Sequence, residues 1–182
     1  FEDAIILKVE QETKKRHNKW REGKIKDVSK KISHAAMKYS MLSHGNNSVI
    51  VFDMERSLAL HGDTGPYLQY VYARISSILK KANARGSKIL FTESLNEEEI
   101  GIIRKLSRFP KTLELSAEKF DPSLLSHYLY ELAQIFSVFY ERVPVLKGEP
   151  KMLAQRLAIL RAVDIVFKKG LKILGIEPLE QM

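Results

Sequence analysis

Residues 60–81 read LHGDTGPYLQYVYARISSILKK, in which a turn with two glycines leads into an amphipathic stretch. The glycines let the turn adopt unusual backbone angles. Asp63 or Thr64 can cap the helix that follows, and Pro66 suits its first turn. At helical spacing, one face collects the apolar side chains Leu68, Val71, Tyr72, Ile75, Ile78 and Leu79. Tyr70 lies off that face, so the segment predicts a helix with one exposed tyrosine.

The residues before this turn predict further helices. Residues 2–20 favour a helix that passes into a basic surface segment, and Gly23 is expected to interrupt it. Asp27 is a candidate N-cap for a second helix, which apolar residues at helical spacing support. The β-prone residues 49–52 are interpreted as an extended connector, and residues 53–60 favour a short helix.

The remainder of the chain alternates turns and amphipathic stretches. Residues 83–94 form the best candidate linker. Asn96 precedes three glutamates, a pattern that suits the N-terminus of a helix because negative charge is stabilised there. The Asp-Pro pair at residues 121–122 predicts the start of a long helix. A last helix carries an apolar stripe that Asp164 interrupts, and Gly175 is expected to end it.

These patterns together predict an all-α fold, a bundle of amphipathic helices packed on one another. We expect a helical lead-in at residues 1–48 and the main helical domain at residues 49–182. No internal repeat or low-complexity tract interrupts this organisation. Because the chain starts at Phe1 with helix-like sequence already under way, we expect it to be a fragment of a longer protein.

The charge of the chain favours a negatively charged partner. It has 30 Lys and Arg residues against 22 Asp and Glu residues, a net charge of +8 and a pI of about 9.5. Many of the basic residues gather at residues 14–26. Nucleic acid, an acidic protein or a membrane surface would each suit this charge, and so would a plain solvated helix.

Several classes of function are excluded by residue content. The chain has no cysteine, which removes disulfides, a cysteine nucleophile and thiolate zinc sites, and fits a reducing cytoplasm. No apolar run approaches the ~18 residues that a membrane span needs. The five histidines never approach metal-ligand spacing. Residues 62–65 lack the Lys-Ser/Thr of a phosphate-binding loop, which argues against nucleotide binding there. The sequence shows no catalytic constellation elsewhere either.

Tyrosines and arginines are the side chains best suited to bind a ligand here. Helical segments carry Tyr67, Tyr70, Tyr128, Tyr130 and Tyr140 together with Arg74, Arg142 and Arg156. Unstacked RNA bases are held by aromatic rings and guanidinium planes. Tyrosines that simply line a helical core are the alternative interpretation, and the helical period places Tyr72 and Tyr128 inward.

Four segments resemble arginyl-tRNA synthetases. Residues 52–75 resemble the block after the catalytic domain in that family, where an FDW-type start leads to a GDTGPYLQYxxxR core. Residues 156–182 resemble the family's ending, and Tyr128–Ala133 and the Phe139-Tyr140 pair also match. Met54, His61 and Gln181 stand where the family usually has Trp, Glu and Arg.

This resemblance implies the DALR-type anticodon-binding domain of a class I aminoacyl-tRNA synthetase, an all-helical bundle. Its expected partner is the anticodon stem-loop of tRNA(Arg). The resemblance carries over as RNA-contacting positions Gly62, Asp63, Tyr70, Arg74, Tyr140 and Met182.

Catalysis, by the same resemblance, belongs to another part of a parent enzyme. Neither an HIGH-type nor a KMSKS-type signature occurs in the chain. Arginine activation with ATP and Mg is therefore expected upstream of Phe1, and this chain is expected to need no cofactor and to be inactive alone. We expect a cytoplasmic monomer that contacts no membrane and joins the catalytic domain of its parent chain. A helical protein-interaction module with a basic surface and a catalytically dead synthetase relative remain the alternatives.

Overall fold

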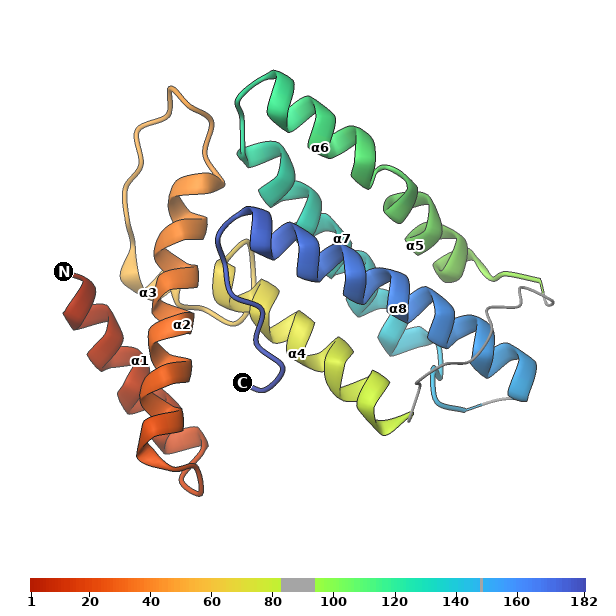
Figure 1. Ribbon diagram of the computed structural model, residues 1–182, viewed down its shortest axis with the longest axis horizontal. Helices are drawn as coiled ribbons and strands as arrows, with labels where there is room; N and C mark the ends of the chain where they lie inside the picture. Colours follow the sequence, from red (N-terminus) through yellow and green to blue (C-terminus); the bar gives the residue numbers. More distant parts are fainter. Residues whose placement is uncertain (83–93, 148) are drawn as a thin grey trace.

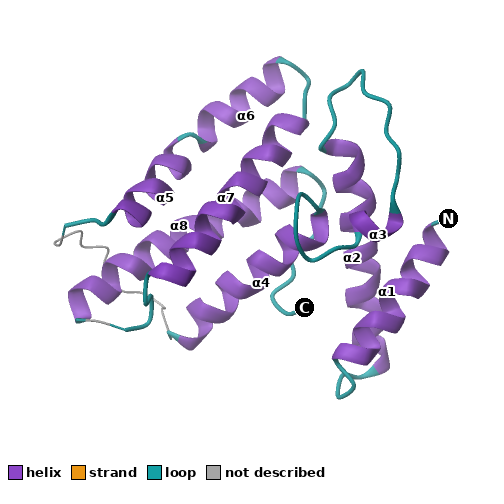
Figure 2. Ribbon diagram, turned by 180° about the vertical axis from the view of Figure 1, so that it is seen from behind, coloured by secondary structure: helices purple, strands orange, loops and turns teal. Residues whose placement is uncertain are grey.

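The computed structural model describes residues 1–82, 94–147 and 149–182, and these ranges are helical without any strand (Figures 1 and 2). This confirms the all-α prediction. In chain order, the described helices are α1 (Glu2–Arg16), α2 (Glu22–Leu42), α3 (Met54–Ser57), α4 (Gly65–Lys81), α5 (Glu97–Ser107), α6 (Phe109–Glu118), α7 (Ser123–Arg142) and α8 (Pro150–Ile173). None of them is both long and apolar enough to cross a membrane.

Helices α1 and α2 form a hairpin beside the other helices (Figure 1). The predicted break at Gly23 and the predicted cap at Asp27 are both wrong, because α2 already begins at Glu22. The physical reason is Ile25, which is 4% exposed and begins the buried stripe of α2 before Asp27. Asp27 instead accepts a hydrogen bond from Lys31, one turn later, at 2.9 Å.

The glycine turn sets α4 directly against α2. Thr64, rather than Asp63, is the N-cap, since its hydroxyl accepts a hydrogen bond from the Tyr67 amide at 3.1 Å. Gly62 adopts a positive φ of 75°. A Cβ atom on Gly65 would lie 2.2 Å from the Ala35 carbonyl oxygen of α2. Only a glycine at this position allows the two helices to approach so closely.

Other predicted helix ends agree with the structure. Asn96 and Glu99 form a reciprocal capping box at the start of α5. Gly175 has a positive φ of 67° directly after α8. Residues 49–52 belong to no helix or strand, and α3 is shorter than the predicted residues 53–60. The predicted linker at residues 83–94 lies outside the described residues except for Ser94.

The larger hydrophobic core lies between α4, α5, α7 and α8 and is closed at one side by α6. Its fully buried large side chains include Leu68, Ile75, Ile102, Leu125, Leu129, Leu132, Phe136, Phe139, Ile159 and Phe167. Tyr72 and Tyr128 are buried too, as predicted. Arg156 and Glu99 form a buried ion pair at 3.2 Å, and Arg156 also donates to the Pro144 carbonyl, so the charge is not left unpaired.

A second, smaller core holds the α1–α2 hairpin to the C-terminal tail, residues 174–182. Its buried members are Ile5, Val9, Val28, Ile32 and Leu179. The tail leaves α8 and runs past α4 toward the hairpin (Figure 1). Glu177 anchors it, because its carboxylate pairs with Lys31 at 2.8 Å and its carbonyl accepts from Gln69 at 2.8 Å. The proposed boundary between residues 48 and 49 stays a prediction.

Candidate functional site

Three predicted site residues meet on the outer face of α4 and α7. Tyr70 and Arg74 lie one helical turn apart on α4, and Tyr140 comes from α7. The Arg74 guanidinium carbon lies 4.6 Å from the centre of the Tyr140 ring and 5.9 Å from the centre of the Tyr70 ring. Tyr70 is 37% exposed, which confirms the prediction of an exposed tyrosine. The cation–π contacts keep the guanidinium beside both rings.

These side chains line an open cavity of about 530 Å³. Helix α4 forms one wall, and Tyr140 from α7 lies beside it. The turn between α1 and α2 and the C-terminal tail supply the rest. The full lining is His17, Trp20, Tyr70, Ala73, Arg74, Ser77, Ile78, Lys81, Tyr140, Glu180, Gln181 and Met182. Aromatic rings, cations and one thioether thus share a single hollow that is open to solvent.

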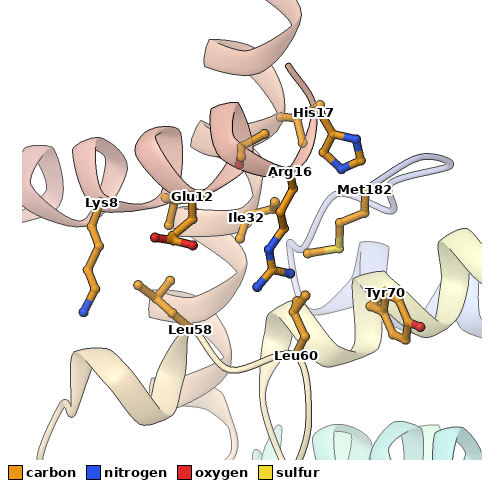
Figure 3. A pocket seen from close by; sticks show the side chains of 12 residues that line it. Lys8, Glu12, Arg16, His17, Ile32, Leu58, Leu60, Tyr70 and Met182 are labelled. Atoms are coloured by element: carbon orange, nitrogen blue, oxygen red, sulfur yellow. The ribbon is translucent and has the colours of Figure 1, made fainter. Parts of the chain in front are cut away.

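A smaller cavity of about 190 Å³ adjoins the first. The two share His17, Tyr70 and Met182. Figure 3 shows Met182 between α1, which carries Arg16, and α4, which carries Tyr70. The wall of this cavity is mainly apolar, with charged side chains among its lining residues. Besides the three shared residues, the lining consists of Lys8, Val9, Glu12, Thr13, Arg16, Val28, Ile32, Leu58 and Leu60.

Gly62 and Asp63, the other two predicted site residues, lie apart from this cavity lining. Asp63 accepts a hydrogen bond from the Tyr39 hydroxyl, and its other carboxylate oxygen lies 3.8 Å from the His127 Nε2 atom. Burial, followed by the contact with Asp63, raises the pKa of Tyr39 far above its usual range. Asp63 therefore fixes the turn to the bundle and borders a different cavity, of about 280 Å³. Their predicted RNA contact stays a prediction.

The sequence interpretation did not single out His17 and Trp20 as site residues. Both come from the turn between α1 and α2, and the structure places them opposite residues about 50 positions later in the chain, on α4. One signal was available. Trp20 is the only tryptophan of the chain, and it follows four Lys and Arg side chains within the stretch KKRHNKW of residues 14–20. A large aromatic ring in a basic segment is typical of nucleic-acid contact.

Polar contacts hold the tail against this cavity. Lys80 pairs with Glu180 at 2.6 Å, and this contact lowers the pKa of the Glu180 carboxyl. Lys24 donates to the Gln181 side chain at 2.5 Å. No cluster of three or more metal-ligating His, Cys, Asp or Glu side chains occurs among the residues described. The site is therefore equipped for stacking and for binding negative charge.

Known proteins resemble this chain in sequence. Residues 68–182 match the family model of the DALR anticodon binding domain. The chain is 39% identical to an arginine–tRNA ligase of Cutibacterium acnes over 166 residues, covering 83% of this chain and 30% of that protein. It is 34% identical to the arginine–tRNA ligase of Saccharophagus degradans over 183 residues, covering 99% of this chain and 32% of that protein.

Solved structures give the same result. The arginyl-tRNA synthetase of Thermus thermophilus superposes with a TM-score of 0.88 and 25% identity, over 99% of this chain and 32% of that one. The chain thus spans about a third of the length of these relatives. The motif, the all-helical bundle and the family match agree, and the chain belongs to the DALR anticodon binding domain family of arginyl-tRNA synthetases.

Proposed function

We propose that this chain binds the anticodon stem-loop of tRNA(Arg) and that splayed anticodon bases enter the cavity of about 530 Å³. The observation that carries the proposal is the exposed Tyr70 ring beside the Arg74 guanidinium and Tyr140. Aromatic rings and guanidinium planes hold unpaired bases by stacking. Met182 adds an apolar surface at the edge of the same cavity.

The charge of the chain supports RNA as the ligand. A net charge of +8 attracts a polyanion, and Arg74 and Lys81 place cations at the cavity itself. Phosphate contacts of this kind position an RNA, whereas contacts with the bases distinguish one anticodon from another. We assign the first role to the basic side chains and the second to the tyrosines.

The proposed role is part of a larger reaction. Relatives of about three times this length are arginine–tRNA ligases. We propose that a parent enzyme of this kind attaches arginine with ATP and Mg in a catalytic domain outside residues 1–182. In this proposal the chain supplies RNA binding without a cofactor of its own, and it works as a cytoplasmic monomer.

The main test compares two tyrosines of α7. Tyr140→Ala should weaken binding of a labelled tRNA(Arg) anticodon hairpin by ~1–3 kcal/mol, because one stacking surface is lost. Tyr130→Ala is the matched control, since Tyr130 is also half-buried on α7 but lies outside the cavity lining. Fluorescence anisotropy at fixed salt measures both. Equal affinities for the two variants would remove Tyr140 from the site.

Methionines allow a similar comparison for the tail. Met182→Ala should weaken RNA binding more than Met152→Ala, because both are half-buried but only Met182 borders the cavity. Deletion of Met182 should act in the same direction. Unchanged affinity after either change would discard the proposed role of the tail.

Salt and anticodon dependence separate this proposal from a protein-interaction module. Log affinity should fall linearly with log salt, and Lys81→Ala should reduce that slope by ~1. Lys169→Ala, at an exposed position of α8 outside the cavity lining, is the control. A hairpin with a changed anticodon should bind more weakly. Equal binding of every hairpin would instead favour a general basic surface.

A further inference from the structure

Trp20 offers an aromatic surface that the proposed site has not used. It is the only tryptophan of the chain, is half-buried, and lies in the turn between α1 and α2. Its backbone amide donates to the His17 carbonyl at 3.0 Å, which fixes the turn. The side chain lines the same cavity as Tyr70 and Tyr140. The cavity therefore has aromatic side chains from both the hairpin and the bundle.

His17 and Lys24 both contact the indole ring. The His17 ring stacks on one face, with ring centres 3.9 Å apart and planes 12° apart. A parallel ring at that distance leaves no room for another group on the same face. The Lys24 ammonium, 4.0 Å from the centre of the indole, therefore covers the opposite face. Gln181 of the tail accepts a hydrogen bond from that ammonium at 2.5 Å.

Displacing Lys24 from the indole costs little free energy. Lys24 and Gln181 are both exposed, so water can replace their contact. A nucleobase stacked on an aromatic ring gains more free energy than an exposed cation over the same ring. The displaced ammonium stays on a flexible stem and can bind the phosphate of the same nucleotide. The exchange therefore favours a stacked base once RNA is present.

Positive charge around the turn suits such a ligand. Lys14, Lys19 and Arg21 are exposed and form no ion pair with the residues that the structure describes. They flank Trp20 in the sequence on either side. Cations beside an aromatic platform are the usual combination for single-stranded nucleic acid, because the cations follow the phosphates while the ring takes a base.

We propose that Trp20 is a second stacking site for an unpaired RNA base, and that Lys24 covers this site until RNA binds. The proposal rests on the proposed function of the chain as an RNA-binding domain. It extends the contact from α4 and α7 to the α1–α2 turn, so that unpaired bases are held from both walls of one cavity. Lys24 then changes partner, from indole and Gln181 to phosphate.

The single tryptophan makes the wild-type chain its own probe. A titration with a tRNA(Arg) anticodon hairpin should quench Trp20 emission and protect the indole from acrylamide. A label on the RNA reports binding independently of the tryptophan. A labelled blunt-ended RNA duplex of similar size, which has no unpaired bases, is the control, and it should leave Trp20 emission unchanged at concentrations where its label shows binding.

Substitutions test the same point by affinity. Trp20→Leu keeps apolar packing but removes the ring, and should weaken hairpin binding by roughly 5- to 100-fold. Trp20→Phe should recover most of that loss. Phe52→Leu is the matched control, because Phe52 is a half-buried aromatic side chain packed on the same small core but absent from the cavity lining. Circular dichroism checks that each variant is folded.

Lys24→Ala tests the cover. Before RNA is added, it should make the indole more accessible to acrylamide, whereas Lys26→Ala, which removes the same charge from α2, should not.

The outcomes separate the two proposals. If labelled RNA binds with anticodon dependence but Trp20 emission and Trp20→Leu affinity stay unchanged, the second stacking site is overturned and the proposed function stands. If no hairpin binds the wild-type chain, both are overturned. If Trp20→Leu does not fold, the second stacking site is tested by emission quenching and acrylamide protection of Trp20 in the wild-type chain alone.

Discussion

The two hydrophobic cores of this chain differ in what holds them together. The larger core has 25 buried members among the described residues, most of them from α4, α5, α7 and α8. The smaller core has five, and one of these, Leu179, comes from the tail at the other end of the chain. The α1–α2 hairpin is therefore held both by packing of α2 on α4 and by this long-range contact with the tail, and the candidate RNA cavity lies where hairpin, tail and bundle meet.

The largest expected effect is in the larger core. Phe136 is 0% exposed on α7, and Phe136→Ala should lower the free energy of unfolding by about 3–5 kcal/mol through lost burial and a cavity. Urea unfolding followed by circular dichroism measures this loss. Trp20 emission should shift with it, because the hairpin packs on the bundle through α2 and α4. A Trp20 transition that stays at the wild-type midpoint would show that the hairpin is independent.

Leu179→Ala should act on the smaller core. Leu179 is 6% exposed, and its truncation should destabilise the docked hairpin by about 2–4 kcal/mol. The two signals should then separate, with Trp20 emission changing at lower urea than the circular dichroism of the whole chain. Coincident transitions in this variant would contradict the division into two cores and indicate a single cooperative unit.

Alkaline pH should weaken the larger core through Tyr72. Burial, with the nearby Asp164 carboxylate as a second cause, raises the pKa of Tyr72 to about 12. A tyrosine in the unfolded chain ionises near pH ~10, so the stability it contributes is complete below that pH and is lost as pH rises through the folded value. The loss is about 2–3 kcal/mol.

Tyr72→Phe should remove this part of the pH dependence. Urea midpoints between pH 10 and 12 measure it, with the variant flatter than the wild-type chain. Identical slopes would show that the Tyr72 hydroxyl ionises in the folded protein as freely as in the unfolded chain.

The smallest effect concerns the contact between hairpin and tail. Lys31 bridges Asp27 on α2 and Glu177 on the tail, with a side chain that is 26% exposed. Lys31→Ala should lower hairpin stability by ~0.5–1 kcal/mol, and less at high salt. Lys15→Ala removes an exposed pair with Glu12 that does not reach the tail. Lys15→Ala should leave the Trp20 transition nearly unchanged. An equal shift in both variants would show that Lys31 does not hold the tail.

Local signals in the sequence explain most of the correct predictions. Thr64 and Asn96 act as caps because their side chains satisfy amides within three residues, which needs no information from the rest of the chain. Tyr70 was predicted to be exposed from helical spacing alone, and it is. The break predicted at Gly23 failed because burial of Ile25 on α2 outweighs the weak helix preference of glycine.

The sequence predicted the types of residue in the candidate site but not all of the residues that line it. Tyr70 and Arg74 share a helix face, which spacing reveals. Their partners His17 and Trp20 come from a turn about 50 residues earlier, and no local pattern predicts that proximity. Asp63 stands next to the same helix in sequence, yet it turns to Tyr39 and borders another cavity.

The sequence by itself determined most of the helices, the cap at Asn96 and the family to which the chain belongs, because helical period, capping chemistry and the GDTGPYLQY motif are local properties. Tertiary structure alone decided which side chains share the cavity. That choice depends on the approach of α4 to α2 at Gly65 and on the course of the tail, both of which follow from packing between residues far apart in the chain.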